Sequence, residues 1–221
     1  MKRFLCLLCF CGAVFAQVAE KANKEYQTKE GRETIARHLA DPARAETQRP
    51  RDIVAAMGLQ PGNVVADVGT GVGLMLPYLS KAVGKKGEVI GEDISNDFLD
   101  KARLKVQTER LDNVKLVLGN DKSPNLPADT LEAVLVLDAY HHFDYPEAML
   151  AHIRDSLLSD GRLVIVDYYK RQDAMPGGRA MEHIRLDEDD VIKEIEANGF
   201  RVSTKQELIP KTQYLVIFVK K

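Results

Sequence analysis

The sequence predicts one α/β domain built on a doubly wound, mostly parallel β-sheet. Short apolar runs alternate with amphipathic helical segments from about residue 50 onward, and a glycine-rich turn follows the first run. Two apolar runs at the C-terminal end lie close enough to pair as a hairpin. The chain has 221 residues, of which 45% are hydrophobic, enough to bury one core. We therefore expect helices on both faces of the sheet and a ligand site at its carboxyl edge.

Charge and cysteine usage exclude several classes of function. The formal net charge is -2, which argues against a broad nucleic-acid surface. All three cysteines fall within residues 6–11, so a disulfide framework in the body of the domain is excluded. No Cys/His cluster has the spacing of metal ligands, and we expect no metal site.

The first residues are typical of a secretory signal. Lys2 and Arg3 precede an apolar run that ends at Phe15, and the chain then continues with Ala16-Gln17. This run is too short to span the ~30 Å of a bilayer core, so we expect no stable membrane span in the mature chain. We expect cleavage near Ala16-Gln17 to remove residues 1–16 and the protein to be exported, to the periplasm or beyond.

The remaining elements follow from apolar periodicity and from helix start and stop signals. Residues 17–46 are polar and predict a mobile or loosely helical lead-in or lid, ahead of a domain over 47–221. The expected elements are a helix from Pro50 to Gly58, strand 64–68, helix 72–83, strand 88–94, a helix capped by Ser95, strand 114–118, strand 133–137, a helix capped by Asp144, Pro146 and Glu147, strand 163–166, a helix opened by Asp187, and strands 202–209 and 214–219. Strand 133–137 is apolar on both faces and is expected at the centre of the sheet.

A glycine-rich turn joins the first strand to the next helix. Gly69, Gly71 and Gly73 allow the backbone to turn sharply and to approach a ligand closely. A dinucleotide fingerprint needs glycine at position 74, where this sequence has Leu74. The carboxylate of Asp67, just ahead of the turn, would repel a pyrophosphate and suits a ligand with an ammonium group.

Acidic residues also end the next two strands. Asp93 ends the second strand, where its carboxylate can accept hydrogen bonds from both hydroxyls of a ribose. The neighbouring Glu92 is expected to point the other way along the strand. Asp121 follows the third strand and is placed to accept a hydrogen bond from an adenine amino group. A glycine turn alone is often only structural, but together with these acids it predicts a nucleoside-type ligand.

Three segments resemble the motifs of class I S-adenosylmethionine-dependent methyltransferases. Residues 64–73 resemble the first motif, residues 89–95 the second, and residues 157–166 the approach to the fifth strand. With residues 139–143 after the fourth strand, the pattern is similar to the subgroup of ubiquinone/menaquinone-pathway and arsenite methyltransferases. The arsenite enzymes capture their substrate with cysteines, and the expected mature chain has none.

The resemblance implies a Rossmann-like, seven-stranded sheet with an antiparallel last strand, and S-adenosylmethionine as the cofactor. In it, Asp67 and the turn 69–73 would hold the methionine moiety and Asp93 the ribose. Ile94 would flank the adenine, and Asp121 would bind its amino group. The expected cofactor-binding residues are Asp67, Gly69, Thr70, Gly71, Gly73, Asp93, Ile94, Asp121 and Asp138.

The catalytic candidates follow the fourth strand, at the ligand edge of the sheet. His141 or His142 is a candidate base, because imidazole titrates near neutral pH; orientation of the loop is the equal alternative. Tyr140 is expected to present its ring to the sulfonium, and Asp138 to be a cofactor-side or loop-fixing acid. His183 is a candidate to cover the substrate, with a surface position as the alternative.

The sequence therefore predicts a methyltransferase that acts on a small-molecule acceptor. Arg44, Gln48 and Arg49 precede the first core helix, where they contact an anionic substrate or lie on a solvated face. Two other classes compete with this prediction. One is a nicotinamide-dependent oxidoreductase, disfavoured by Asp67 and Leu74, and the other is a binding protein without catalysis.

Overall fold

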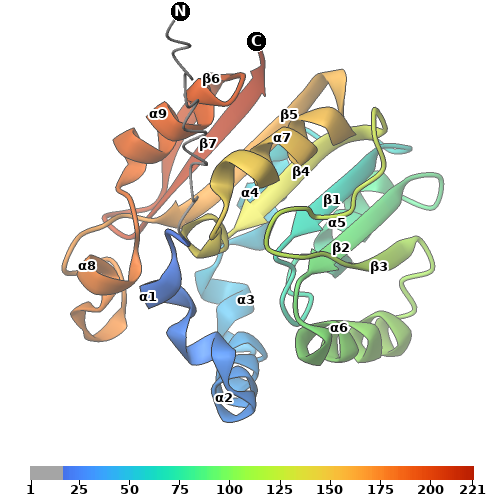
Figure 1. Ribbon diagram of the computed structural model, residues 1–221. Coiled ribbons are helices and arrows are strands. Elements are labelled where there is room, and N and C mark those ends of the chain that lie inside the picture. Colours follow the sequence, from blue (N-terminus) through green and yellow to red (C-terminus); the bar gives the residue numbers. More distant parts are fainter. Residues whose placement is uncertain (1–16) are drawn as a thin grey trace, which may run out of the picture.

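The computed structural model describes residues 17–221 as a β-sheet with helices on both of its faces (Figure 1). The predicted secretory signal in residues 1–16 lies outside the described residues, together with all three cysteines. None of the helices in residues 17–221 combines the length and the apolar character that crossing a membrane requires.

Within residues 17–221 the sheet has seven strands in the order β3-β2-β1-β4-β5-β7-β6. They are β1 (Val64–Val68), β2 (Glu88–Asp93), β3 (Val114–Leu118), β4 (Leu131–Leu137), β5 (Leu157–Tyr168), β6 (Phe200–Ile209) and β7 (Gln213–Lys220). The first five pair in parallel, whereas β7 runs antiparallel to both β5 and β6. This topology confirms the predicted fold class, the antiparallel last strand and the C-terminal hairpin.

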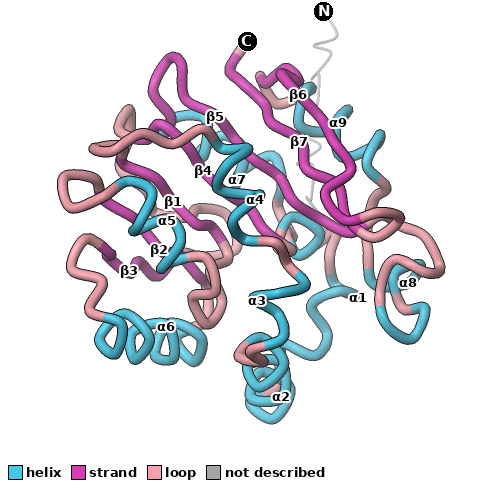
Figure 2. Tube along the Cα trace, turned by 180° about the vertical axis from the view of Figure 1, so that it is seen from behind, coloured by secondary structure: helices cyan, strands magenta, loops and turns pink. Residues whose placement is uncertain are grey.

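Helices cover both faces of the sheet. On one face lie α4 (Pro50–Met57), α5 (Leu76–Val83) and α6 (Asn96–Glu109), which Figure 2 shows from behind. On the other lie α7 (Pro146–Ser156) and α9 (Glu188–Ala197), in front of the sheet in Figure 1. The central strand β4 therefore lies between two apolar layers. Each large apolar side chain buried in this way contributes about 1.5–3 kcal/mol, which fixes the strand from which the catalytic candidates follow.

Two elements begin four or more residues away from the predicted start. The helix predicted from residue 72 begins at Leu76, because Gly73 still has a φ of +86° and continues the turn. The strand predicted from residue 163 begins at Leu157, directly after α7. The central part of each element, which the apolar pattern marks, lies where it was predicted.

Two predicted helix caps are wrong. Ser95 precedes α6 but its side chain accepts no hydrogen bond from it; its own N–H donates to Oδ1 of Asp93, over 2.9 Å. Asp144 does not cap α7 either. Its carboxylate accepts hydrogen bonds from the N–H of Ala19 at 3.2 Å and from Nδ2 of Asn23 at 3.1 Å. For Asp144, partners in residues 17–23 take the place of the helix N–H groups, whereas Pro146 and Glu147 stand in the first turn of α7 as predicted.

Residues 17–48, called the N-terminal segment below, fold across one end of the sheet (Figure 1). The helical parts of this segment are α1 (Glu20–Asn23), the 3-10 turn η1 (Lys24–Gln27), α2 (Lys29–Leu39) and α3 (Ala43–Thr47). The predicted loose lead-in is thus a packed helical cover. Tyr26 and Ala36 form an apolar cluster with Val72 after β1 and Phe98 of α6.

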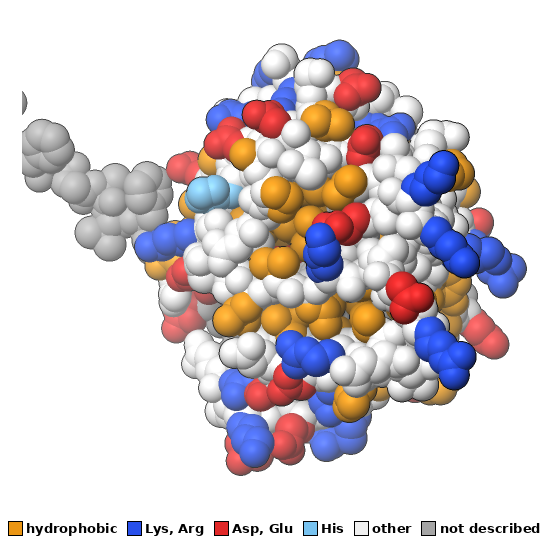
Figure 3. Space-filling model, turned by 90° about the vertical axis from the view of Figure 1, so that its right-hand side faces the viewer, with side chains coloured by type: hydrophobic (Ala, Val, Ile, Leu, Met, Phe, Trp, Pro, Cys, Tyr) orange, Lys and Arg blue, Asp and Glu red, His pale blue; other side chains and the backbone are white. Residues whose placement is uncertain are grey.

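The edge of the sheet at β3 is less covered than its centre. β3 pairs with β2 alone, and Leu118 at its end is 45% exposed. Figure 3 shows the molecule from this side, with hydrophobic side chains gathered near the middle of the face and charged side chains around them. The cavity described next opens among the ends of the strands instead.

Candidate functional site

A cavity of about 600 Å³ lies between the carboxyl ends of the central strands and the N-terminal segment. Its walls include the turn after β1, the end of β2, the segment after β4, and residues of α1, α2 and α3. A volume of this size falls within the ~300–1,000 Å³ of ordinary small-molecule sites. The site therefore lies at the edge of the sheet that the alternating pattern predicted.

The glycine turn forms one wall of this cavity. Gly69 and Gly71 line it with φ of +73° and +57°, values that other residues adopt only at a cost. A Cβ on Gly69 would lie 2.6 Å from Cβ of Ala139, so the turn also passes too close to the segment after β4 for any side chain. Gly73 does not line the cavity; a Cβ there would meet Leu76 at the start of α5.

Two predicted carboxylates hold this turn in place. Oδ2 of Asp67 accepts a hydrogen bond from the hydroxyl of Thr70 at 2.6 Å. Oδ2 of Asp93 accepts one from the N–H of Gly71 at 2.9 Å, and its Oδ1 accepts one from Ser95. A carboxylate has about four lone-pair positions, so two on Asp93 stay open for other donors in the cavity.

Glu92 also faces the site, which corrects the expectation that it points away. Its Oε2 accepts a hydrogen bond from the N–H of Gly69 at 3.3 Å, and its buried Oε1 has no partner among the described residues. The side chain fits because Gly119 lies beside it and has no Cβ. Strand alternation places Glu92 and Asp93 on opposite faces, but at the end of β2 both carboxylates reach the same turn.

The three acidic side chains give the cavity the capacity for negative charge. Burial raises the pKa of Asp67 to about 7 and that of Asp93 to about 6, and it raises the pKa of Glu92 well above its usual value. Within residues 17–221 none of the three forms an ion pair. A ligand that brings positive charge into this wall would favour their ionised forms.

The other predicted ligand-binding residues lie around the same cavity. Ile94 lines it and is 59% exposed, as expected of a side chain that a flat ring would cover. Asp121 lines it from an exposed position at the rim. Asp138 follows β4 with a φ of +51°, and burial raises the pKa of its carboxyl to about 7. The fold thus brings together ends of strands that are far apart in sequence.

Asp138 links this edge of the sheet to the N-terminal segment. Its Oδ2 accepts a hydrogen bond from Nη2 of Arg44 at 2.9 Å, and its Oδ1 accepts one from Nε2 of Gln213 at 2.6 Å. Oε1 of Gln213 in turn accepts a hydrogen bond from Nε2 of Gln48 at 2.9 Å. Arg49 donates to the carbonyl oxygen of Leu208. Arg44 and Gln48 are therefore structural contacts rather than a solvated face, whereas Arg49 stays exposed.

The catalytic candidates differ in what they contact. His142 alone among them lines the cavity; its Nδ1 lies 2.8 Å from Oδ1 of Asn23 and its Nε2 lies 3.3 Å from the hydroxyl of Tyr26. His141 lies behind it and is buried, with Nδ1 2.7 Å from Oδ1 of Asp167. The ring of His183 stands 5.0 Å and 5.2 Å from those of His141 and His142.

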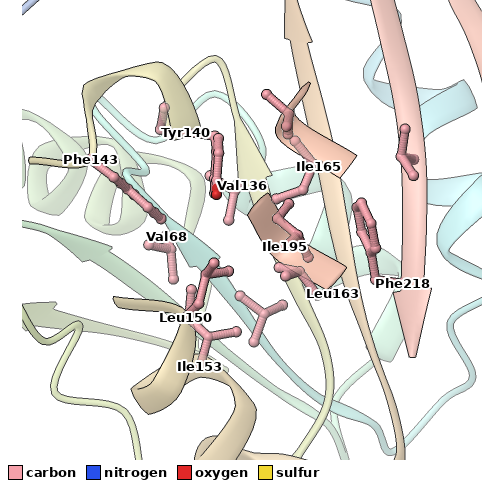
Figure 4. Packing of buried hydrophobic residues seen from close by; sticks show 14 of the residues in the cluster. Val68, Val136, Tyr140, Phe143, Leu150, Ile153, Leu163, Ile165, Ile195 and Phe218 are labelled. Carbon is pink, nitrogen blue, oxygen red and sulfur yellow. The ribbon is translucent and has the colours of Figure 1, made fainter. Parts of the chain in front are cut away.

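Tyr140 does not take the predicted position beside a sulfonium. Its side chain is fully buried in the core, where Figure 4 shows it close to Val136. Its hydroxyl donates to Oε1 of Glu194 in α9, over 2.7 Å. The 3-10 turn η2 (Tyr140–His142) places the ring of Tyr140 in the core and the ring of His142 at the cavity. The expectation that Tyr140 presents its ring to a sulfonium is therefore wrong.

Several residues that shape the cavity were missed by the sequence analysis. Asn23, Tyr26 and Gln213 belong to segments that carry no recognisable motif. Their partners lie 75 to 119 positions away along the chain, so only the folded chain brings them together. For Glu92 a signal existed, an acid next to the predicted ribose-binding Asp93, but strand alternation argued against it.

Comparisons with known proteins agree with this geometry. Residues 65–161 match the family model described as a methyltransferase domain. A SAM dependent methyltransferase from Aquifex aeolicus has a similar structure, with a TM-score of 0.77 and 29% sequence identity; the match covers 85% of this chain and 98% of that one.

Curated relatives point to the same chemistry. A ubiquinone/menaquinone biosynthesis C-methyltransferase of Marinomonas sp. (strain MWYL1) is 28% identical over 121 residues, 54% of this chain and 48% of that protein. A demethylmenaquinone methyltransferase of Geobacillus sp. (strain WCH70) is 32% identical over 119 residues, 54% and 47% of the two chains. The chain spans about half the length of the curated relatives it matches.

The residues around the cavity fit S-adenosylmethionine. The glycine turn leaves room that a Cβ would fill, and Asp93 keeps free acceptor positions within the cavity. The carboxylates without ion-pair partners suit a ligand that carries a sulfonium and an ammonium group. Together with the matched family and the similar structure, these features support an enzyme of the S-adenosylmethionine-dependent methyltransferase kind, with S-adenosylmethionine as its cofactor.

Proposed function

We propose that the protein transfers a methyl group from S-adenosylmethionine to a small-molecule acceptor held in the cavity under the N-terminal segment. The single observation that carries this proposal is the turn Gly69–Gly71 between Asp67 and Asp93, because the turn and both carboxylates line one cavity. Charge and shape there suit a cationic amino-acid nucleoside, and they do not suit a pyrophosphate.

Each residue of the cavity wall has a distinct task in this proposal. Asp67, held by Thr70, and the N–H groups of the turn bind the amino-acid end of the cofactor. Asp93 accepts hydrogen bonds from the ribose at its two open positions. Ile94 covers one face of the adenine, and Asp121 at the rim accepts a hydrogen bond from its amino group. These assignments rest on where the side chains lie around the cavity.

When bound, the cofactor supplies a methyl group on a positively charged sulfur, which is a good leaving group. The protein then needs to align the acceptor, exclude water and accept a proton where one is lost. The N-terminal segment supplies part of the cover for this task, since Tyr26 and Leu39 line the cavity. His142 is the candidate base that reaches the acceptor, because burial lowers the pKa of its ring well below the usual value and keeps it neutral.

For the acceptor we propose a flat, largely apolar ring with hydroxyl groups, such as a quinol. The cavity wall near His142 includes the apolar side chains of Phe143 and Met149. The relatives named for ubiquinone and menaquinone biosynthesis favour the same class. Residues 17–221 contain no cysteine, so a thiol that captures arsenite is missing from them.

We further propose that residues 1–16 are a secretory signal and that the mature enzyme works outside the cytosol. The basic start, the short apolar run and the small residues before Gln17 support this proposal. An exported methyltransferase needs a supply of cofactor made elsewhere.

Calorimetric titration tests the proposed cofactor directly. We expect S-adenosylhomocysteine to bind with one site per chain and NAD to show no binding. A panel of quinol, thiol and amine acceptors with labelled S-adenosylmethionine then tests the proposed acceptor class. Tight cofactor binding with no labelled product on any acceptor would instead favour a binding protein without catalysis.

A further inference from the structure

Three of the five histidines of the chain meet beside the cavity. His141 and His142 belong to η2 after β4, and His183 ends the short helix α8 (Ala180–His183). One ring nitrogen from each lies within 4.8 Å of the others. The remaining two, His38 and His152, are exposed on α2 and α7. Because His183 follows His142 by 41 positions, the spacing of the histidines in the sequence does not predict the cluster.

The ring of His141 is oriented by a carboxylate behind it. Nδ1 of His141 lies 2.7 Å from Oδ1 of Asp167, and its backbone N–H donates to Oδ2 of the same residue at 3.2 Å. An ionised Asp167 can only accept, so Nδ1 carries the proton and Nε2 carries the lone pair. Metal-binding histidines typically have this arrangement, in which a carboxylate fixes the tautomer and makes the ring a better ligand.

The ring of His142 is oriented in a similar way by an amide. Nδ2 of Asn23 donates to the carbonyl oxygen of His142 at 3.0 Å and to Oδ2 of Asp144 at 3.1 Å. These two bonds fix the amide group, so its Oδ1 faces Nδ1 of His142 as an acceptor. Nδ1 therefore carries the proton, and the lone pair lies on Nε2, where the hydroxyl of Tyr26 now donates.

The third ring is free to act as a ligand. His183 makes no side-chain hydrogen bond with any of residues 17–221. No hydrogen bond within these residues therefore occupies either ring nitrogen of His183. The guanidinium of Arg179 lies close enough to oppose a cation, while the carboxylate of Asp167 favours one.

We propose that His141, His142 and His183 form a binding site for one divalent transition-metal ion of the Zn²⁺ class. Imidazole nitrogens suit Zn²⁺, and three histidines leave a fourth position open for a water or an oxygen of a small molecule. Ligands about 2.0–2.1 Å from a tetrahedral ion lie about 3.4 Å apart, so the rings need to move by about 1 Å to close on it. The ion replaces the hydroxyl of Tyr26 as the partner of Nε2 on His142.

The position of the site gives the ion a role. His142 lines the cavity, so the open position of the ion faces the space assigned to the acceptor. With the ion in place, a hydroxyl oxygen of the acceptor binds the ion instead of the His142 ring. The ion favours the deprotonated oxygen, and the proton passes to solvent water. This use of the ion rests on the proposed methyl transfer, whereas binding of the ion does not.

Metal titration of the full, untagged chain tests the site, with the thiols of Cys6, Cys9 and Cys11 blocked by alkylation because thiolates bind Zn²⁺ themselves. The protein is first freed of metal with a chelator, and Zn²⁺ is then titrated in competition with a chromogenic chelator. We expect one tight site per chain and, with Co²⁺, the visible bands of a four-coordinate ion. His183→Ala, and His183→Gln if the first variant unfolds, should abolish the tight site. Asp167→Asn should weaken it by ~10–100-fold, the usual effect of losing an outer partner of a ligand.

The two exposed histidines provide matched controls. His38→Ala and His152→Ala remove an imidazole each and should leave Zn²⁺ affinity unchanged. The proposal is overturned if Zn²⁺ binds wild type and His183→Ala equally, or if Co²⁺ gives no four-coordinate bands. S-adenosylhomocysteine titrated into the same samples separates the two proposals: intact binding of this ligand without a metal site overturns the metal proposal alone. A metal site without binding of this ligand overturns the proposed cofactor alone.

Discussion

Arg44 of α3 and Asp138 after β4 form an ion pair, with 2.9 Å between Nη2 and Oδ2, that fastens the N-terminal segment to the carboxyl edge of the sheet. The carboxyl of Asp138 is buried, and its position between Arg44 and Gln213 satisfies both of its oxygens. The pair therefore couples closure of the cavity to the stability of the fold. A buried pair of this kind costs more to break than it contributes when intact.

We expect Arg44→Met to destabilise the protein by about 2–3 kcal/mol, because it leaves the Asp138 carboxyl buried without its counter-charge. The cofactor should also bind more weakly, since the closed N-terminal segment is populated less. Urea unfolding and calorimetry measure the two effects. Arg103→Met, which breaks an exposed pair with Asp100 on α6, is the control and should change stability by less than about 1 kcal/mol.

Asp93→Ala should weaken binding of S-adenosylhomocysteine by more than about tenfold, because the variant loses charge-assisted hydrogen bonds to the ribose worth ~1.5–3 kcal/mol each. Asp93→Asn keeps the shape and should bind better than the alanine variant. Melting curves check that the turn still folds, since Asp93 also accepts hydrogen bonds from Gly71 and Ser95. Unchanged affinity in a folded Asp93→Ala protein would show that the ribose lies elsewhere.

Gly69→Ala should abolish cofactor binding, because the new Cβ would lie 2.6 Å from Cβ of Ala139 and must displace the turn. Gly62→Ala is its matched control. Gly62 also has a positive φ, +99°, but nothing lies within 4 Å of a Cβ there. Both variants lose about 1 kcal/mol of stability from the strained backbone. Only the first should lose affinity in calorimetry; equal losses in both variants would contradict the proposed role of the turn.

Stability of the cofactor-free protein should fall as pH rises from 6.5 to 8.5. Asp67 and Asp138 have pKa values of about 7 when folded and ordinary values near 3.8 when unfolded, so only the folded state still binds their protons near pH 7. As the pH rises through 7, the folded state also releases these protons. This lowers the free energy of unfolding by about 1 kcal/mol for each group between pH 6.5 and 8.5. His142 and His183 have lowered pKa values and act in the opposite direction, but only below about pH 6.5.

Urea midpoints at the two pH values measure this slope. Asp67→Asn removes one of these groups and should make the fall in stability smaller. A stability that is constant or rises between pH 6.5 and 8.5 would mean that the carboxyls of Asp67 and Asp138 are already ionised in the folded protein.

Mass spectrometry of the protein from its native source should find Gln17 as the first residue, because the predicted secretory signal ends at Ala16. Replacing Lys2 and Arg3 by glutamate should keep the precursor uncut, since the basic start orients the signal. A native protein that still begins at Met1 would contradict the proposed export.

The sequence by itself determined the features that depend on local patterns. The alternation of apolar runs with helical segments predicted the parallel sheet, and the turn from Gly69 to Gly73 predicted the ligand edge. These predictions succeed because the carboxyl ends of parallel strands lie at one edge of the sheet, independently of the conformation of the loops. The resemblance of residues 64–73 to a methyltransferase motif rested on the same local features and agrees with the matched family.

Only the tertiary structure decided the features that depend on partners far along the chain. The polar composition of the N-terminal segment predicts a loose structure. In the fold, however, Tyr26 packs against the apolar cluster of Val72 and Phe98, and Arg44 forms an ion pair with Asp138. Tyr140 turns into the core because Glu194 of α9 offers its hydroxyl an acceptor there. The three histidines meet for the same reason: packing of α8 beside η2 brings His183 to its partners, and such a contact leaves no periodic trace in the sequence.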